Sequence, residues 1–144
     1  MPVGRKYTAS EAYERGKEVI RVGTPYSNNV IQIGVGMDCS GFIWYIFGFP
    51  TPRLTTAQMI DTSRMENADF IRLPYTGVGS LQKGDVLCYK DSPMGHTTFY
   101  IGNGRIMHET DGRAQYGSAP GGAMTTVFRP KEGWGFFPIK WEGD

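Results

Sequence analysis

The spacing of apolar residues changes near Lys83, and this change constrains the fold more than any other feature of the chain. Before Lys83, two segments repeat their apolar residues with the period of an α-helix. After it, short segments rich in β-branched and aromatic residues alternate as strands do. Helices that come first and strands that follow predict an α+β domain with an antiparallel sheet. With 144 residues, we expect one domain spanning residues 1–144.

The two expected helices have clear start and stop signals. Residues 8–22 predict a helix that Thr8 or Ser10 can cap and that ends at Gly23. Residues 39–47 are the most apolar stretch and predict a second helix with Asp38 as its N-cap. A loop is expected from residue 26 to residue 37, and a short helix at residues 55–61.

The second half of the chain predicts the sheet. The glycines and the asparagine of Gly102-Asn103-Gly104 predict a hairpin turn between two of its strands. Residues 111–122 are rich in glycine and predict a loop. Strands are expected at residues 85–89, 96–101, 105–110, 124–129 and 133–139, with a further short strand near Phe70.

Composition excludes several classes of protein. The net charge is +1, with 15 basic and 14 acidic residues, so no field favours nucleic acid as a partner. The longest apolar runs fall well short of the roughly 20 residues that span a bilayer, so no membrane span is expected. The first residues have no apolar core of an export signal. We also expect a monomer.

Cys39 begins the second predicted helix. The unpaired amides and the dipole of a helix N-terminus stabilise negative charge, and so favour the reactive thiolate over the thiol. The alternative is a buried, inert cysteine, which is the better interpretation of such a residue considered alone. Cys88 lies in a strand-like run and is interpreted as a small core residue.

His96 and His108 are the only two histidines and lie on the two arms of the predicted hairpin. A two-residue Asn103-Gly104 turn would put them on opposite faces. A three-residue Gly102-Asn103-Gly104 loop pairs Ile101 with Arg105, sets His96 opposite Thr110 and His108 opposite Thr98, and puts both rings on one face. We predict the three-residue loop, because Gly104 suits its left-handed last position.

This register would give the three residues catalytic roles. His96 would take the proton of the Cys39 thiol and later protonate the leaving amine, while His108 would orient the His96 ring. The alternative for each histidine is an ordinary half-buried strand residue. The three side chains could also ligate zinc, but the helix N-terminus accounts for the cysteine without metal, so no metal or other cofactor is expected.

Several segments together resemble the NlpC-type cell-wall peptidases, a papain-like group. They follow the order and approximate spacing of that family: Thr24-Pro25-Tyr26, Asp38-Cys39-Ser40-Gly41-Phe42, Thr55-Thr56-Ala57-Gln58, Lys83-Gly84-Asp85-Val86, Gly95-His96 through Gly104, and Ile106-Met107-His108. The resemblance implies a papain-like fold with N-terminal helices packed on a central antiparallel sheet. It also implies Cys39 as nucleophile, His96 as base and His108 as the third polar residue.

The resemblance extends to the surroundings of the nucleophile. It implies that Tyr26 orients the site or stabilises the oxyanion, and that Asp38 and Ser40 hold the free amine of a stem peptide. For Tyr26 the alternative is a loop aromatic that covers the core, and for Asp38 and Ser40 it is helix capping. Three departures affect the expected groove: Thr97-Thr98-Phe99 after the base, Glu109 after the third polar residue, and a loop at residues 28–36 without a tryptophan-glycine pair.

The resemblance implies a cysteine endopeptidase that cleaves peptidoglycan stem peptides, at the bond between D-glutamate and a diamino acid, through a thioester. Alternatives are an N-acetylmuramoyl-L-alanine amidase, an acyl transferase, or a non-catalytic domain that binds the wall or serves in a phage tail. Without an export signal, we expect release by lysis, carriage in a phage virion, or secretion within a larger protein. A bell-shaped pH profile of kcat/KM is expected from a thiolate-imidazolium pair.

Overall fold

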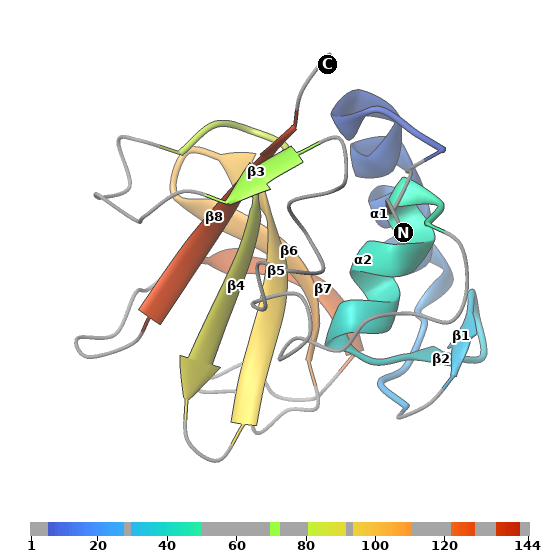
Figure 1. Cartoon of the computed structure of the whole chain (residues 1–144). Helices are drawn as coiled ribbons and strands as arrows, with labels where there is room; N and C mark the ends of the chain where they lie inside the picture. The colour runs from blue at the N-terminus through green and yellow to red at the C-terminus, as the bar shows by residue number, and fades with distance from the viewer. Residues whose placement is uncertain are drawn as a thin grey trace.

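A computed structural model describes residues 6–27, 30–49, 70–72, 81–91, 94–110, 122–128 and 135–141. Two helices lie to one side of a sheet (Figure 1). The predicted helix at residues 55–61 and nearly all of the predicted loop at 111–122 lie outside the described residues. The elements are α1 Ala9–Val22, β1 Ile31–Gln32, β2 Gly36–Met37, α2 Cys39–Phe47, β3 Phe70–Arg72, β4 Val86–Asp91, β5 Met94–Gly102, β6 Arg105–Thr110, β7 Gly122–Val127 and β8 Gly135–Trp141.

The six-stranded sheet has the order β3-β8-β4-β5-β6-β7, and all of its pairs are antiparallel. This confirms the predicted α+β class. Strand β8 lies between β3 and β4, so it pairs on both sides with strands that are far from it in sequence. Within the described residues, neither helix is long and apolar enough to cross a membrane.

Local signals account for both helices. The Thr8 side chain accepts a hydrogen bond from the Glu11 amide at 3.2 Å, and the Glu11 side chain accepts one from the Thr8 amide at 3.1 Å. This capping box satisfies two amides that the first helical turn leaves open. Gly23 and Gly48 end the two helices in the left-handed conformation, at φ 81° and 68°.

The segment between the helices corrects one expectation. Instead of a plain loop over residues 26–37, β1 and β2 form a small antiparallel pair with Ile31 opposite Met37. A parallel bridge also joins Tyr26 to Met37. Two-residue strands are too short to produce an alternating pattern, so the spacing of apolar residues could not reveal them.

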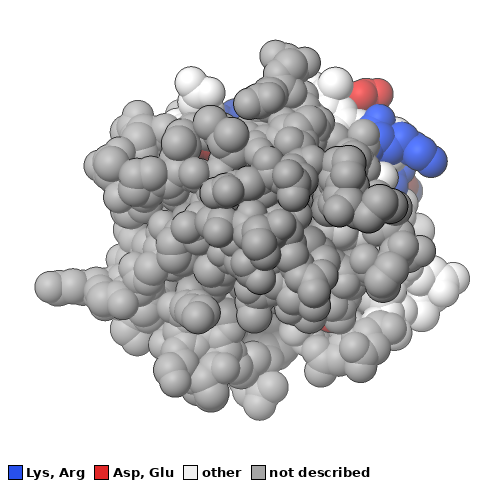
Figure 2. Space-filling model, in the orientation of Figure 1, with Lys and Arg blue, Asp and Glu red and all other residues white. Residues whose placement is uncertain are grey.

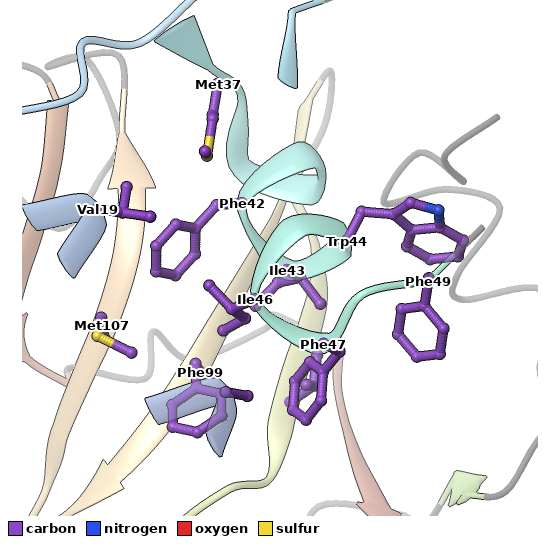
Figure 3. Packing of buried hydrophobic residues seen from close by; sticks show 12 residues of the cluster. Val19, Met37, Phe42, Ile43, Trp44, Ile46, Phe47, Phe49, Phe99 and Met107 are labelled. Carbon is purple, nitrogen blue, oxygen red and sulfur yellow. The ribbon is translucent and has the colours of Figure 1, made fainter. Parts of the chain in front are cut away.

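The hydrophobic core lies between the helices and the sheet. Phe42, Ile46 and Phe47 of α2 pack with Phe99 of β5 and Met107 of β6 (Figure 3). Gly16 of α1 faces Met107 and Phe42, and a Cβ added there would require the end of the Met107 side chain to move. A glycine within a helix costs about 1 kcal/mol relative to alanine.

The turn between β5 and β6 is not the predicted three-residue loop. Gly102 pairs with Arg105, so only Asn103 and Gly104 form the turn, with φ of 54° and 71°. Positive φ at both positions is typical of the tight turn that matches strand twist. The register then shifts between Tyr100 and Gly102, so that Phe99 pairs with Met107.

This bulge has a consequence for the two histidines. It omits one residue from the pairing, and so restores the register that a three-residue loop would have produced. The backbone pairs run from Gly102–Arg105 to Phe99–Met107, and the register of the last two pairs is the one in which His96 faces Thr110 and His108 faces Thr98. The two histidine side chains meet, as the three-residue loop had predicted.

Candidate active site

The two histidine rings are in direct contact. The His96 Nε2 lies 2.7 Å from the His108 Nδ1, and the rings meet edge to face with centroids 5.0 Å apart. The His108 Nε2 lies 3.1 Å from the Thr126 Oγ1 of β7. His108 is fully buried, and His96 is half-buried. A chain of three polar side chains therefore crosses β5, β6 and β7.

The direction of these hydrogen bonds determines which nitrogen of His96 can act as a base. When His108 donates from Nε2 to the Thr126 hydroxyl, its Nδ1 accepts the proton on the His96 Nε2. The His96 Nδ1 then carries a lone pair and takes no part in the histidine pair. This arrangement suits a base that receives a proton at Nδ1 while its ring is held through Nε2.

Burial keeps both rings neutral. Desolvation lowers the pKa of His96 well below its ordinary value of 6.5, and the nearby His108 lowers it further. Burial alone lowers the pKa of His108 to about 4. Below pH 6.5 these histidines bind protons in the unfolded chain, whereas in the folded chain their lowered pKa values keep them neutral to lower pH. The free energy of unfolding therefore falls as the pH drops from 6.5 towards 4.

Cys39 is the first residue of α2, and it is buried as a thiol rather than as half of a disulfide. The Asp38 Oδ1 accepts a hydrogen bond from the Gly41 amide at 2.8 Å, which confirms the predicted N-cap. The amides of Cys39 and Ser40 lie in the same first turn, where a helix has no carbonyl partners for them. The positive end of the helix dipole is thus directed at Cys39.

The other residues predicted to surround the nucleophile lie in the same part of the fold. Ser40 is buried within the first turn of α2. Tyr26 is half-buried, and its backbone bridges to Met37, two residues before Cys39. The backbone of Tyr26 therefore lies beside the segment that leads into α2, and its role at the site stays a prediction.

Glu109 lies at the same end of β6 as His108. It follows His108 in sequence and is fully buried. Within the described residues, neither of its carboxyl oxygens has a hydrogen-bond partner. Burial, and secondarily the charge of Asp38, raise the pKa of Glu109 to about 8. Because α2 packs against both β5 and β6, the charge of Asp38 at its N-cap acts on this end of β6.

The described His, Cys, Asp and Glu side chains do not form a group of three with the arrangement that holds a metal ion. The histidine pair is accounted for by its mutual hydrogen bond and by Thr126. The chemistry that this arrangement supports is proton transfer at the histidine pair.

The fold and the site define the class of the protein. Cys39 is the first residue of a helix that packs on a sheet, and two strands of that sheet carry histidines joined by a hydrogen bond. This is the arrangement of papain-like α+β proteins. Residues 23–129 match the NlpC/P60 family, and the chain belongs to that family.

Known relatives agree with this assignment. A gamma-DL-glutamyl hydrolase of Bacillus subtilis (strain 168) is 28% identical over 90 residues, which cover 60% of this chain but only 19% of the relative. The fold is similar to NlpC1 from Trichomonas vaginalis, with a TM-score of 0.59 and 16% identity, over 95% of this chain and 46% of that one. It is equally similar to the NlpC/p60 domain of the peptidoglycan hydrolase SagA, with a TM-score of 0.59 and 18% identity, over 93% and 99%.

The sequence did not identify two residues of the site. Thr126 reaches His108 because β7 pairs with β6, with Ile106 opposite Thr126. The long segment between these strands hides that register in the sequence. Glu109 was noted only as a departure from the family pattern. Its charge in a run of apolar and polar strand residues was the available signal, because a buried carboxyl group is rare without a specific role.

Proposed function

We propose that the chain is a cysteine peptidase that hydrolyses peptide bonds in bacterial peptidoglycan. The observation that carries the proposal is the 2.7 Å hydrogen bond between His96 and His108. It holds the base by one nitrogen and leaves the other out of the histidine pair, on a sheet against which the cysteine-bearing helix packs. Membership of the NlpC/P60 family supports the same chemistry.

In the proposed mechanism the His96 Nδ1 takes the proton of the Cys39 thiol. The resulting thiolate attacks the carbonyl carbon of the substrate, and the carbonyl oxygen becomes negatively charged. The Cys39 amide and the Tyr26 hydroxyl donate hydrogen bonds to that oxygen. When the intermediate collapses, His96 returns its proton to the nitrogen of the leaving amine, and Cys39 is left as a thioester.

Hydrolysis of the thioester completes the cycle. His96, again neutral, removes a proton from water as the water attacks the thioester carbonyl. The second tetrahedral intermediate expels the Cys39 thiolate, which recovers a proton from His96, and the carboxylic acid departs. The lowered pKa of His96 keeps its ring neutral at pH 7, which is the form that can accept the proton.

We propose that the scissile bond joins D-glutamate to the diamino acid of a stem peptide. The similarity to a gamma-DL-glutamyl hydrolase supports a γ-glutamyl bond, although the chain spans only 19% of that relative. Asp38 and Ser40, at the first turn of α2, would hold the free amine of the stem peptide. The enzyme would reach the wall by lysis, in a phage virion or as part of a secreted protein.

Zymography on purified cell walls tests the proposal, with wild type beside Cys39→Ala. We expect clearing by wild type and none by the variant, since the thiol is the attacking group. Equal clearing by both proteins would contradict the peptidase mechanism. No clearing by a folded wild type, together with binding to the walls, would favour a wall-binding or phage tail component.

Mass spectrometry of the digested walls identifies the bond. New amino termini on the diamino acid are expected, with D-glutamate at the new carboxyl terminus. Free muramic acid lactyl groups beside L-alanine amino termini would instead identify an N-acetylmuramoyl-L-alanine amidase. Products joined to an added amine would identify an acyl transferase.

A further inference from the structure

A recess lies beside the C-terminal end of α2, whereas Cys39 is the first residue of that helix. Its volume is about 250 Å³. Gly48 follows Cys39 by nine residue steps along the helix, which corresponds to roughly 14 Å along the axis. The recess runs along Trp44, Tyr45 and Gly48 at the end of α2 and also reaches Ile31, which pairs with Met37 two residues before Cys39. Aromatic rings and two cations line it: Tyr7, Trp44, Tyr45, Phe49, Lys6 and Arg15.

Arg15 is held rigidly at the edge of this recess. Its guanidinium lies 4.2 Å from the centre of the Tyr7 ring and 4.3 Å from that of Tyr45. Its Nε and Nη2 donate to the Tyr45 carbonyl oxygen at 3.3 and 2.8 Å. These bonds satisfy a carbonyl in the last turn of α2 and fix the plane of the guanidinium.

The cations of the recess have no acidic partner in the described part of the chain. A guanidinium has five N–H donors, and Arg15 directs only two of its donor positions at the Tyr45 carbonyl. The other basic residues of α1 differ from it, because Lys17 and Arg21 form ion pairs with Glu14 and Glu18. Figure 2 shows basic side chains with acidic atoms beside them at the upper right of this face, where Figure 1 places α1.

We propose that this recess binds a carboxylate or phosphate group of the cell-wall polymer and so retains the enzyme on its insoluble substrate. The planar fork of arginine matches both anions, and Lys6 adds a second positive charge. The aromatic rings offer apolar faces to the sugar or peptide that carries the anion. The inference rests on the proposed function, since that function supplies the polymer.

Binding to purified cell walls, measured by cosedimentation, tests the inference. All variants are made in Cys39→Ala, so that binding is measured without cleavage. Lys6 is exposed, so Lys6→Ala should leave the fold intact and weaken binding about two- to fivefold. Arg15→Lys keeps the charge but loses the fork, and should weaken binding about tenfold. Lys17→Ala is the matched control, because it removes the same charge from α1 outside the recess.

The source of the anion is identified by repeating the measurement on walls stripped of phosphate polymers with hydrofluoric acid. If the variants bind stripped walls as tightly as the parent protein does, the anion is phosphate. If they still bind more weakly, the anion is the carboxylate of peptidoglycan. Inorganic phosphate and N-acetylmuramic acid, added as soluble competitors, should displace the parent protein in the respective cases.

Equal wall binding by the Lys6→Ala, Arg15→Lys and Lys17→Ala variants would overturn the inference. This outcome is distinct from failure of the proposed function. If the protein with Cys39 intact clears walls while all three variants bind equally, only the role of the recess in wall binding is excluded. If it does not clear walls but Lys6→Ala binds more weakly than Lys17→Ala, wall binding by the recess is supported and the peptidase mechanism is contradicted.

Discussion

The two ends of α2 differ in how completely the polar groups around them are hydrogen-bonded. At the C-terminal end, Gly48 adopts the left-handed conformation and Arg15 donates to the Tyr45 carbonyl, so the open carbonyls find partners. At the N-terminal end, Asp38 caps the helix, yet the buried carboxyl of Glu109 close by has no hydrogen-bond partner within the described residues. Buried polar groups without partners reduce stability, and such groups concentrate where a protein performs chemistry.

The largest effect that tests this contrast is the pH dependence of hydrolysis. Below the lowered pKa of His96, kcat/KM on a soluble muropeptide should fall about tenfold per pH unit, as the base becomes protonated. Because burial lowers that pKa, the acid limb should lie below pH 6.5, and the whole profile should be bell-shaped. A flat profile, or an acid limb centred above pH 6.5, would contradict the buried pair.

The C-terminal end of α2 should respond through stability. Arg15→Ala removes two hydrogen bonds to the Tyr45 carbonyl and two ring contacts, and should lower the free energy of unfolding by about 2 kcal/mol. Urea denaturation measures the change. Arg21→Ala is the control, because Arg21 is exposed on the same helix and forms an ion pair with Glu18. We expect it to change stability by less than about 0.5 kcal/mol. Similar losses in both variants would remove the special role of Arg15.

Near the N-terminal end of α2 we expect the opposite result: removal of the Glu109 charge should raise the free energy of unfolding. Glu109 has a raised pKa of about 8, so the folded state keeps a proton that the unfolded state releases above about pH 4.5. Its contribution to stability is therefore lost as the pH rises from 4.5 through 8. Glu109→Gln should be more stable than wild type by about 1 kcal/mol at pH 8, with the difference shrinking towards pH 4.5.

Thermal unfolding of Glu109→Gln and wild type across this pH range measures the difference. Glu14→Gln is the control, since Glu14 is exposed on α1 and pairs with Lys17. A difference between Glu109→Gln and wild type that stays constant from pH 4.5 to pH 8 would show that the carboxyl of Glu109 titrates normally.

The smallest effect concerns the outermost member of the histidine chain. Thr126→Val keeps the shape of the side chain but removes the hydroxyl that meets the His108 Nε2 at 3.1 Å. We expect kcat to fall about threefold, because one neutral hydrogen bond stabilises by about 1 kcal/mol or less. Thr125→Val, next to it on β7 and in contact with Arg105 instead, should leave kcat unchanged. Equal effects of the two variants would exclude a positioning role for Thr126.

Several elements were predictable from the sequence because their signals are local. Thr8 with Glu11, Asp38 and the two closing glycines define the helix ends within a few residues of chain. The alternation after Lys83 likewise predicted β4 to β8 to within about two residues. The order of the family motifs indicated Cys39, His96 and His108 as the site, and the structure brings the two histidines into contact.

Tertiary structure alone decided the features that depend on two distant segments. The position of β8 between β3 and β4, the bulge that restores the register after the Asn103-Gly104 turn, and the reach of Thr126 to His108 all depend on strand pairing. So does the approach of Asp38 to Glu109. Local spacing specifies what an element is, because backbone geometry repeats within it. Which elements become neighbours depends on how the apolar faces of the whole chain are buried together.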